Sequence, residues 1–155
     1  MDDIHVTTVK PQQAAVARRQ GPVSDIAKLL GEALDTVSQA LVKAEASPAG
    51  PAFARYLTVS DDTVSLEAGF PVDGEFRLSG GVESLTLPGG EAAMTLHVGP
   101  YDQLDQVHAS IERWIKDQGR VPAGAPWEAY VTDPTSDPDT STWQTEVYWP
   151  LKPAA

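Results

Sequence analysis

Apolar residues recur three and four positions apart in two stretches of the chain. From Ser24 onward they follow the spacing of a helix with one buried face, until Pro48 interrupts the pattern. The same spacing returns from Asp102 to about Gln118. Proline lacks the amide that helix continuation requires, so the first helix must end before Pro48. The sequence therefore predicts two long helices, the first with Ser24 or Asp25 as its N-terminal cap.

Much of the remaining chain alternates between apolar and polar residues with a period of two, which is typical of strands with one buried face. The clearest alternations lie at residues 4–6, 64–70, 94–98, 127–131 and 147–149. Two long helices combined with several alternating strands predict the α+β class.

The two halves of the chain resemble each other. A Gly-Pro pair precedes each predicted helix, and the two pairs lie 78 positions apart. A longer match, glutamate-x-x-aromatic-proline-aliphatic, begins at Glu67 and again 79 positions later at Glu146. We therefore expect a single domain over residues 1–155, built from strand-helix-strand-strand repeats at about 4–72 and 82–151. The halves would form a curved antiparallel sheet with both helices on one face and a ligand groove between the halves.

Composition narrows the classes of partner. The 155 residues carry 11 basic and 22 acidic side chains, a net charge of −11, so direct nucleic-acid binding and membrane binding are not expected. The absence of cysteine excludes disulfides and thiolate catalysis. No apolar run is long enough to span a bilayer, and the acidic N-terminus does not resemble an export signal, so we expect a cytoplasmic protein.

The three histidines are too scattered along the chain to suggest a metal site, and we expect neither metal nor cofactor. His108 lies on the buried face of the second predicted helix. A hydrogen-bonded core histidine is the favoured interpretation, and a catalytic histidine is the alternative.

One face of the predicted sheet packs on the helices, and strand alternation indicates which side chains point to the other face. Along the last strand Glu146 and Tyr148 point away from the apolar side, and Glu67 takes the matching position in the first half. Alternation within two further strands assigns tyrosines to that same face. The predicted ligand-binding residues are Glu146, Tyr148, Tyr130, Tyr56 and Glu67.

A carboxylate among tyrosine rings suits a lipophilic cation, because the rings attract positive charge and the carboxylate balances it. The alternative is an ordinary exposed strand face, on which glutamate and tyrosine are both common.

Three motifs in order resemble the gyrase-inhibitor-like effector-binding domains, a family found alone or fused to the DNA-binding parts of AraC-type and multidrug-responsive MerR-type transcription regulators. They are Leu87-Pro88-Gly89-Gly90, His97-Val98-Gly99-Pro100-Tyr101, and residues 145–151. The resemblance is best over residues 80–151 and implies a duplicated strand-helix-strand-strand fold. It also implies that Glu146 is the pocket glutamate, which meets cationic aromatic drugs in several members, with Tyr148, Tyr130 and Tyr56 as pocket aromatics.

Three functions remain open. The favoured one is a stand-alone ligand sensor or sequestering protein for hydrophobic, cationic or aromatic small molecules. One branch of the family resembles hydrolases of cyclopropane-bearing compounds, and Glu146 would be the catalytic residue of such an enzyme. The third is an inhibitor of gyrase or another protein partner. Residues 1–23 predict strands and loops rather than a helix-turn-helix, so the chain is not expected to bind DNA itself.

Overall fold

Both long helices and the alternating strands form in a computed structural model, which describes residues 3–73, 81–132 and 138–153. The α+β class is confirmed. Contacts divide the chain into two units. Unit 1 comprises residues 1–10 and 88–155, and unit 2 comprises residues 11–87.

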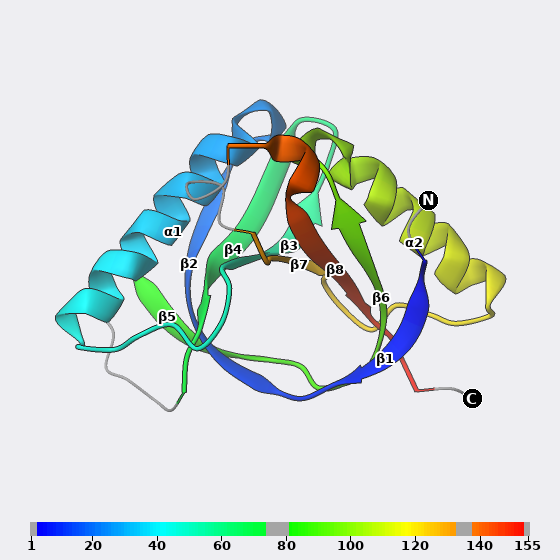
Figure 1. The fold of residues 1–155 in the computed structure, drawn as a ribbon, viewed down its shortest axis with the longest axis horizontal. Coiled ribbons are helices and arrows are strands. Elements are labelled where there is room, and N and C mark those ends of the chain that lie inside the picture. Colours follow the sequence, from blue (N-terminus) through cyan, green and yellow to red (C-terminus); the bar gives the residue numbers. More distant parts are fainter. Residues whose placement is uncertain (1–2, 74–80, 133–137, 154–155) are drawn as a thin grey trace. The chain divides into compact units, whose positions relative to one another are not determined.

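Unit 2 is an antiparallel sheet with one long helix packed on it (Figure 1). Its strands lie in the order β3-β4-β2-β5. The helix buries one apolar face, formed by Ala33, Val37, Ala40 and Leu41. The elements are β2 (Gln12–Pro22), α1 (Ile26–Lys43), β3 (Phe53–Val59), β4 (Thr63–Pro71) and β5 (Val82–Leu87).

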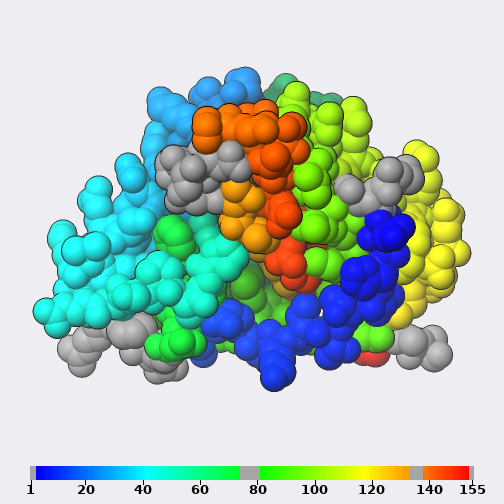
Figure 2. Space-filling view, viewed as in Figure 1, coloured from blue at the N-terminus to red at the C-terminus, as the bar shows by residue number. Residues whose placement is uncertain are grey.

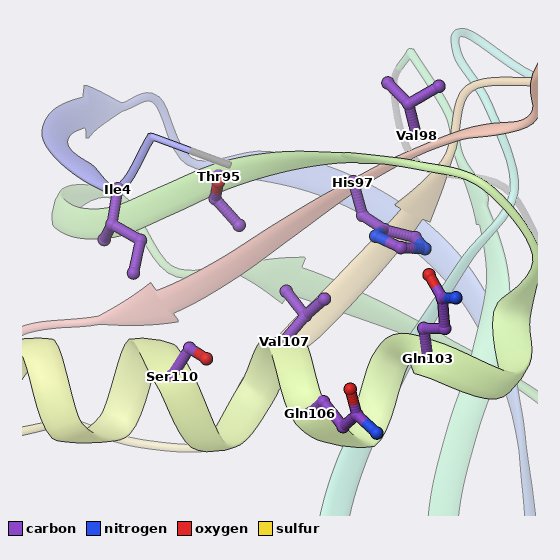
Figure 3. Close-up of a pocket in the computed structure, with 8 residues that line it drawn as sticks. All are labelled: Ile4, Thr95, His97, Val98, Gln103, Gln106, Val107 and Ser110. Carbon is purple, nitrogen blue, oxygen red and sulfur yellow. The ribbon is translucent and has the colours of Figure 1, made fainter. Parts of the chain in front are cut away.

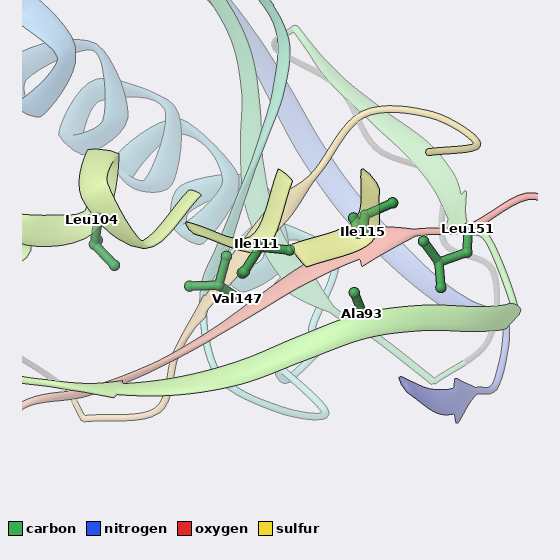
Figure 4. Close-up of a cluster of buried hydrophobic side chains, with 6 residues drawn as sticks. All are labelled: Ala93, Leu104, Ile111, Ile115, Val147 and Leu151. Atoms are coloured by element: carbon green, nitrogen blue, oxygen red, sulfur yellow. The ribbon is translucent and has the colours of Figure 1, made fainter. Parts of the chain in front are cut away.

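Unit 1 has the same construction, with its strands in the order β1-β6-β8-β7. Its helix packs on the sheet through an apolar cluster of Ala93, Leu104, Ile111, Ile115, Val147 and Leu151 (Figure 4). The elements are β1 (His5–Val9), β6 (Gly90–Val98), α2 (Leu104–Asp117), β7 (Trp127–Tyr130) and β8 (Gln144–Pro150). No helix within the described ranges has the length and apolar character needed to cross a membrane.

The N-terminal strand belongs to the second half of the chain. β1 pairs with β6 in an antiparallel register, and its dark blue atoms lie beside green and yellow atoms of that half (Figure 2). The predicted repeat over 4–72 had placed this strand in the first half. Alternation alone identifies a strand but not its pairing partner, which accounts for the difference.

The two units begin their helices in the same way. Pro22 and Pro100 both have an extended backbone, and each leads into a single 3-10 turn, Val23–Asp25 or Tyr101–Gln103. The predicted side-chain cap at Ser24 or Asp25 is wrong, because Ser24 lies within the turn and Asp25 makes no capping hydrogen bond. The turn satisfies the first helical amide through the backbone instead, since Ile26 N–H donates to the carbonyl of Val23.

Candidate ligand-binding site

Glu146 lies on the face of the unit 1 sheet that points away from α2. Its neighbour Val147 is fully buried in the α2 cluster, so alternation turns Glu146 to the opposite side. Cross-strand neighbours share a face, and those of Glu146 are Leu96 on β6 and Ala129 on β7. We call this side the helix-free face of unit 1. Around Glu146 it comprises Met94, Leu96, Trp127, Ala129, Glu146 and Tyr148.

An aromatic pair lies next to Glu146. The ring of Tyr148 stacks on that of Trp127, with centroids 5.2 Å apart and planes inclined by 16°. Burial, the charge of Glu146 and a hydrogen bond to its carboxylate together raise the pKa of the Tyr148 hydroxyl to about 12, and burial is the largest of the three causes. Tyr148 therefore stays protonated at neutral pH and donates to Glu146.

Glu146 has no counter-charge from its own unit among the residues described. None of the ion pairs between described residues involves its carboxylate. Its cross-strand neighbours are apolar, and Trp127 is only 6% exposed. A carboxylate flanked by apolar groups and an aromatic pair can hold a cation that also offers apolar surface.

Glu67, the matching residue of unit 2, has a different environment. Its carboxylate is 1% exposed and receives Arg18 Nε at 3.3 Å and Arg55 Nη1 at 3.0 Å. Both arginines are its cross-strand neighbours on β2 and β3. The charge of Glu67 is therefore already balanced within the protein.

Tyr56 does not share a face with Glu67, so that prediction is wrong. It lies opposite Leu66, which has the same alternation as Val64 on the side covered by α1. The cause is a register shift between Tyr56 and Thr58, which reverses the alternation along β3. The face of β3 was predicted from the apolar residues that follow the shift. That assignment does not apply to the residues that precede the shift.

Tyr130 is also on the helix-covered side, contrary to prediction. It lies opposite Thr145 and is 7% exposed, and its hydroxyl donates to Glu128 Oε1 at 2.8 Å. The sequence misled because the alternating apolar residues Trp127, Ala129 and Val131 were assigned to the core side of the strand. In the structure Trp127 pairs with Tyr148, which turns Tyr130 to the α2 side.

Glu128 belongs to a hydrogen-bond network that ties α2 to β7 and β8. Its Oε2 lies 2.6 Å from His108 Nε2, and the Trp149 indole donates to His108 Nδ1 at 3.0 Å. An indole N–H can only donate, so Nδ1 is the acceptor and Nε2 carries the proton shared with Glu128. The hydrogen bonds expected of His108 are present, and its side chain is partly buried at 18% exposure.

A cleft of about 330 Å³ lies on the α2 side of unit 1 (Figure 3). Thr95 and His97 reach into it from β6, and Val107 and Ser110 face them from α2. Its lining contains no lysine, arginine, aspartate or glutamate. Within the described part of the chain, no group of three His, Asp or Glu side chains could hold a metal ion. The cleft thus offers no counter-charge for a cation.

The geometry adds residues to the site that sequence patterns missed. Trp127, Met94, Leu96 and Ala129 looked like core residues because they are apolar. Only the strand register shows that they surround Glu146.

The model of the GyrI-like small molecule binding domain matches residues 2–152 and so runs through both units. This chain belongs to that family. Its members bind small molecules, and this is a small-molecule-binding domain of the GyrI-like type.

Solved structures show the same fold. The C-terminal domain of EcmrR has a TM-score of 0.84 and 20% identity, with 99% of each chain covered. EcmrR in a complex with DNA has a TM-score of 0.86 and 20% identity, covering 99% of this chain, which spans 58% of the EcmrR chain. SAV2435 bound to tetraphenylphosphonium has a TM-score of 0.67 and 13% identity, with 97% of this chain and 94% of that chain covered. Among curated protein sequences, none matches significantly.

Proposed function

We propose that this GyrI-like domain binds hydrophobic, cationic aromatic molecules on the helix-free face of unit 1, with Glu146 as the counter-charge. The observation that carries the proposal is the local arrangement of Glu146. Its carboxylate lies beside the stacked rings of Tyr148 and Trp127 and takes part in no ion pair among the described residues.

Each component of the arrangement favours such a ligand. The carboxylate attracts a positive centre, and the indole and phenol rings attract it further through their faces. Contact between the apolar neighbours and the rest of the ligand removes apolar surface from water, which favours binding. The net charge of −11 raises the concentration of cations near the surface.

A protein of the same fold supports this class of ligand. SAV2435 was solved with tetraphenylphosphonium, a lipophilic aromatic monocation. We propose that this chain takes ligands of the same chemistry and acts as a ligand sensor or sequestering protein.

Isothermal titration calorimetry with two ions of the same shape tests the role of charge. Tetraphenylphosphonium and tetraphenylborate differ mainly in the sign of their charge. The wild-type chain should bind the phosphonium at least about tenfold more tightly than the borate, a difference of about 1.4 kcal/mol. Glu146→Gln should remove most of this preference, because the amide keeps the shape and loses the charge.

Glu112→Gln is the matched control. Glu112 is exposed on α2, and its substitution changes the net charge by the same amount without touching the helix-free face. It should leave phosphonium affinity within about twofold. Equal phosphonium affinity for the wild type and Glu146→Gln would contradict the proposal.

A further inference from the structure

The two matching glutamates differ in their immediate neighbours. On β4 of unit 2, Glu67 lies between Arg18 of β2 and Arg55 of β3. Both guanidinium groups contact its carboxylate, at 3.3 Å and 3.0 Å. A buried carboxylate that already forms ion pairs with two cations gains little from binding a third.

On β8 of unit 1, Glu146 occupies the matching position with apolar neighbours. The residues paired with it are Leu96 of β6 and Ala129 of β7, which take the places that the arginines hold in unit 2. Side chains directly opposite in an antiparallel pair have Cβ atoms about 4.5–5.5 Å apart. An arginine at position 96 could therefore reach the Glu146 carboxylate as Arg18 reaches Glu67.

The helix-free face of unit 1 offers a single carboxylate. Among the described residues of its four strands that share the alternation of Glu146, none of the others is Asp, Glu, Lys or Arg, and the one histidine is His5 on the edge strand β1. A second positive centre placed on this face would lose its water without gaining a counter-charge.

From this comparison, and resting on the function proposed above, we propose that the chain takes lipophilic monocations, one per chain. Leu96 and Ala129 are the residues that set this specificity, because they do not neutralise the charge of Glu146. In unit 2, by contrast, two arginines neutralise the charge of Glu67. The ligand class is an aromatic cation with one positive centre. Dications gain nothing from their second charge.

Substitution at Leu96 tests the role assigned to it. Its side chain is 38% exposed, so a polar replacement should leave the core intact. Leu96→Arg recreates the unit 2 arrangement and should lower tetraphenylphosphonium affinity at least tenfold. Leu96→Gln, of similar length and neutral, should stay within threefold of the wild type. Urea unfolding of each variant confirms that the fold persists.

A gain of function tests the charge count. The monocation is tetraphenylphosphonium, and the dication is p-xylylenebis(triphenylphosphonium). In the wild type the dication should bind at least about threefold more weakly than the monocation, at one ligand per chain, because its second charge is desolvated without a counter-charge. Leu96→Glu adds a second carboxylate beside Glu146 and should raise the ratio of dication to monocation affinity at least tenfold.

The outcomes separate this inference from the proposed function. If Glu146→Gln leaves phosphonium binding unchanged, the proposed function fails. If Glu146→Gln abolishes binding while Leu96→Arg binds as the wild type does, the site stands and the role of Leu96 is refuted. Two phosphonium ions per chain, or a dication that the wild type binds as tightly as the monocation, would refute the single-charge specificity.

Discussion

Glu67 and Glu146 occupy the same position of the same strand in two units with the same order of elements, and their chemical situations are opposite. Glu67 is buried between two arginines, whereas Glu146 is flanked by leucine and alanine and accepts a hydrogen bond from Tyr148. The backbone cannot account for this difference, because it is shared. The cross-strand neighbours decide whether each glutamate forms ion pairs within its own unit.

The same contrast holds two residues further along each strand. Tyr148 of unit 1 corresponds to Gly69 of unit 2, where a side chain has no room. A Cβ atom at Gly69 would lie 1.8 Å from the carbonyl oxygen of Ala15. Unit 2 therefore lacks the aromatic partner as well as the available charge.

The largest effect is expected from Gly69→Ala. The added methyl group must displace backbone atoms of β2, and we expect the free energy of unfolding to fall by more than about 3 kcal/mol. Urea unfolding followed by circular dichroism measures this. Gly31→Ala is the matched control, because that position on α1 has open space, and it should raise stability by about 0.5–1 kcal/mol. A stable Gly69→Ala variant would show that the backbone of β2 can shift to accommodate the methyl group at little cost in free energy.

Removing each glutamate charge separates the two roles directly. Glu67→Gln leaves two arginines without their shared carboxylate, and Arg55 is only 20% exposed, so we expect a loss of about 3 kcal/mol. Glu146→Gln should change the free energy of unfolding by less than about 1 kcal/mol. Chemical unfolding curves for both variants provide the comparison. Equal losses would mean that Glu146 is structural too.

The two tyrosines first assigned to one site should behave differently. Tyr130→Phe removes a donor from the buried Glu128 carboxylate and should cost about 1–2 kcal/mol of stability without changing phosphonium affinity. Calorimetric titration and thermal unfolding of the same sample measure both quantities. A phosphonium affinity that falls tenfold in Tyr130→Phe would return this residue to the site.

The smallest effect concerns the titration of Tyr148. Its pKa of about 12 lies above the ordinary tyrosine value near 10, so the unfolded chain loses this proton first. The stability contributed by the raised pKa is fully present below pH 10 and is lost as pH rises from about 10 to 12. Tyrosinate absorbance should show a late-titrating component, and its amplitude should fall by one tyrosine in Tyr148→Phe.

Glu146→Gln should lower this late pKa, because the carboxylate charge holds the proton on Tyr148. Glu112→Gln should leave it in place. A late component of unchanged amplitude in Tyr148→Phe would assign the raised pKa to another tyrosine.

The sequence alone determined the two long helices, the alternating strands at 64–70, 94–98 and 147–149, and the direction of Glu146 relative to Val147, but alternation did not predict β2 or β5. Helices and strands follow from local periodicity, and the Gly-Pro pairs mark equivalent helix starts because each proline fixes an extended residue before a 3-10 turn. Glu146 was placed correctly relative to Val147 because alternation needs only the neighbouring residue.

Strand pairing decided the rest. Tyr56 and Tyr130 were assigned to the wrong face because a register shift in β3 and the pairing of Trp127 with Tyr148 reverse what alternation within one strand indicates. The ion pairs of Glu67 join residues 49 and 12 positions apart in the sequence, and local periodicity gives no information about such distant partners. Local patterns fix the direction of a side chain relative to its neighbours. Only the register of the sheet fixes which residues it meets, and those contacts pair one glutamate with two arginines and leave the other without an ion pair among the described residues.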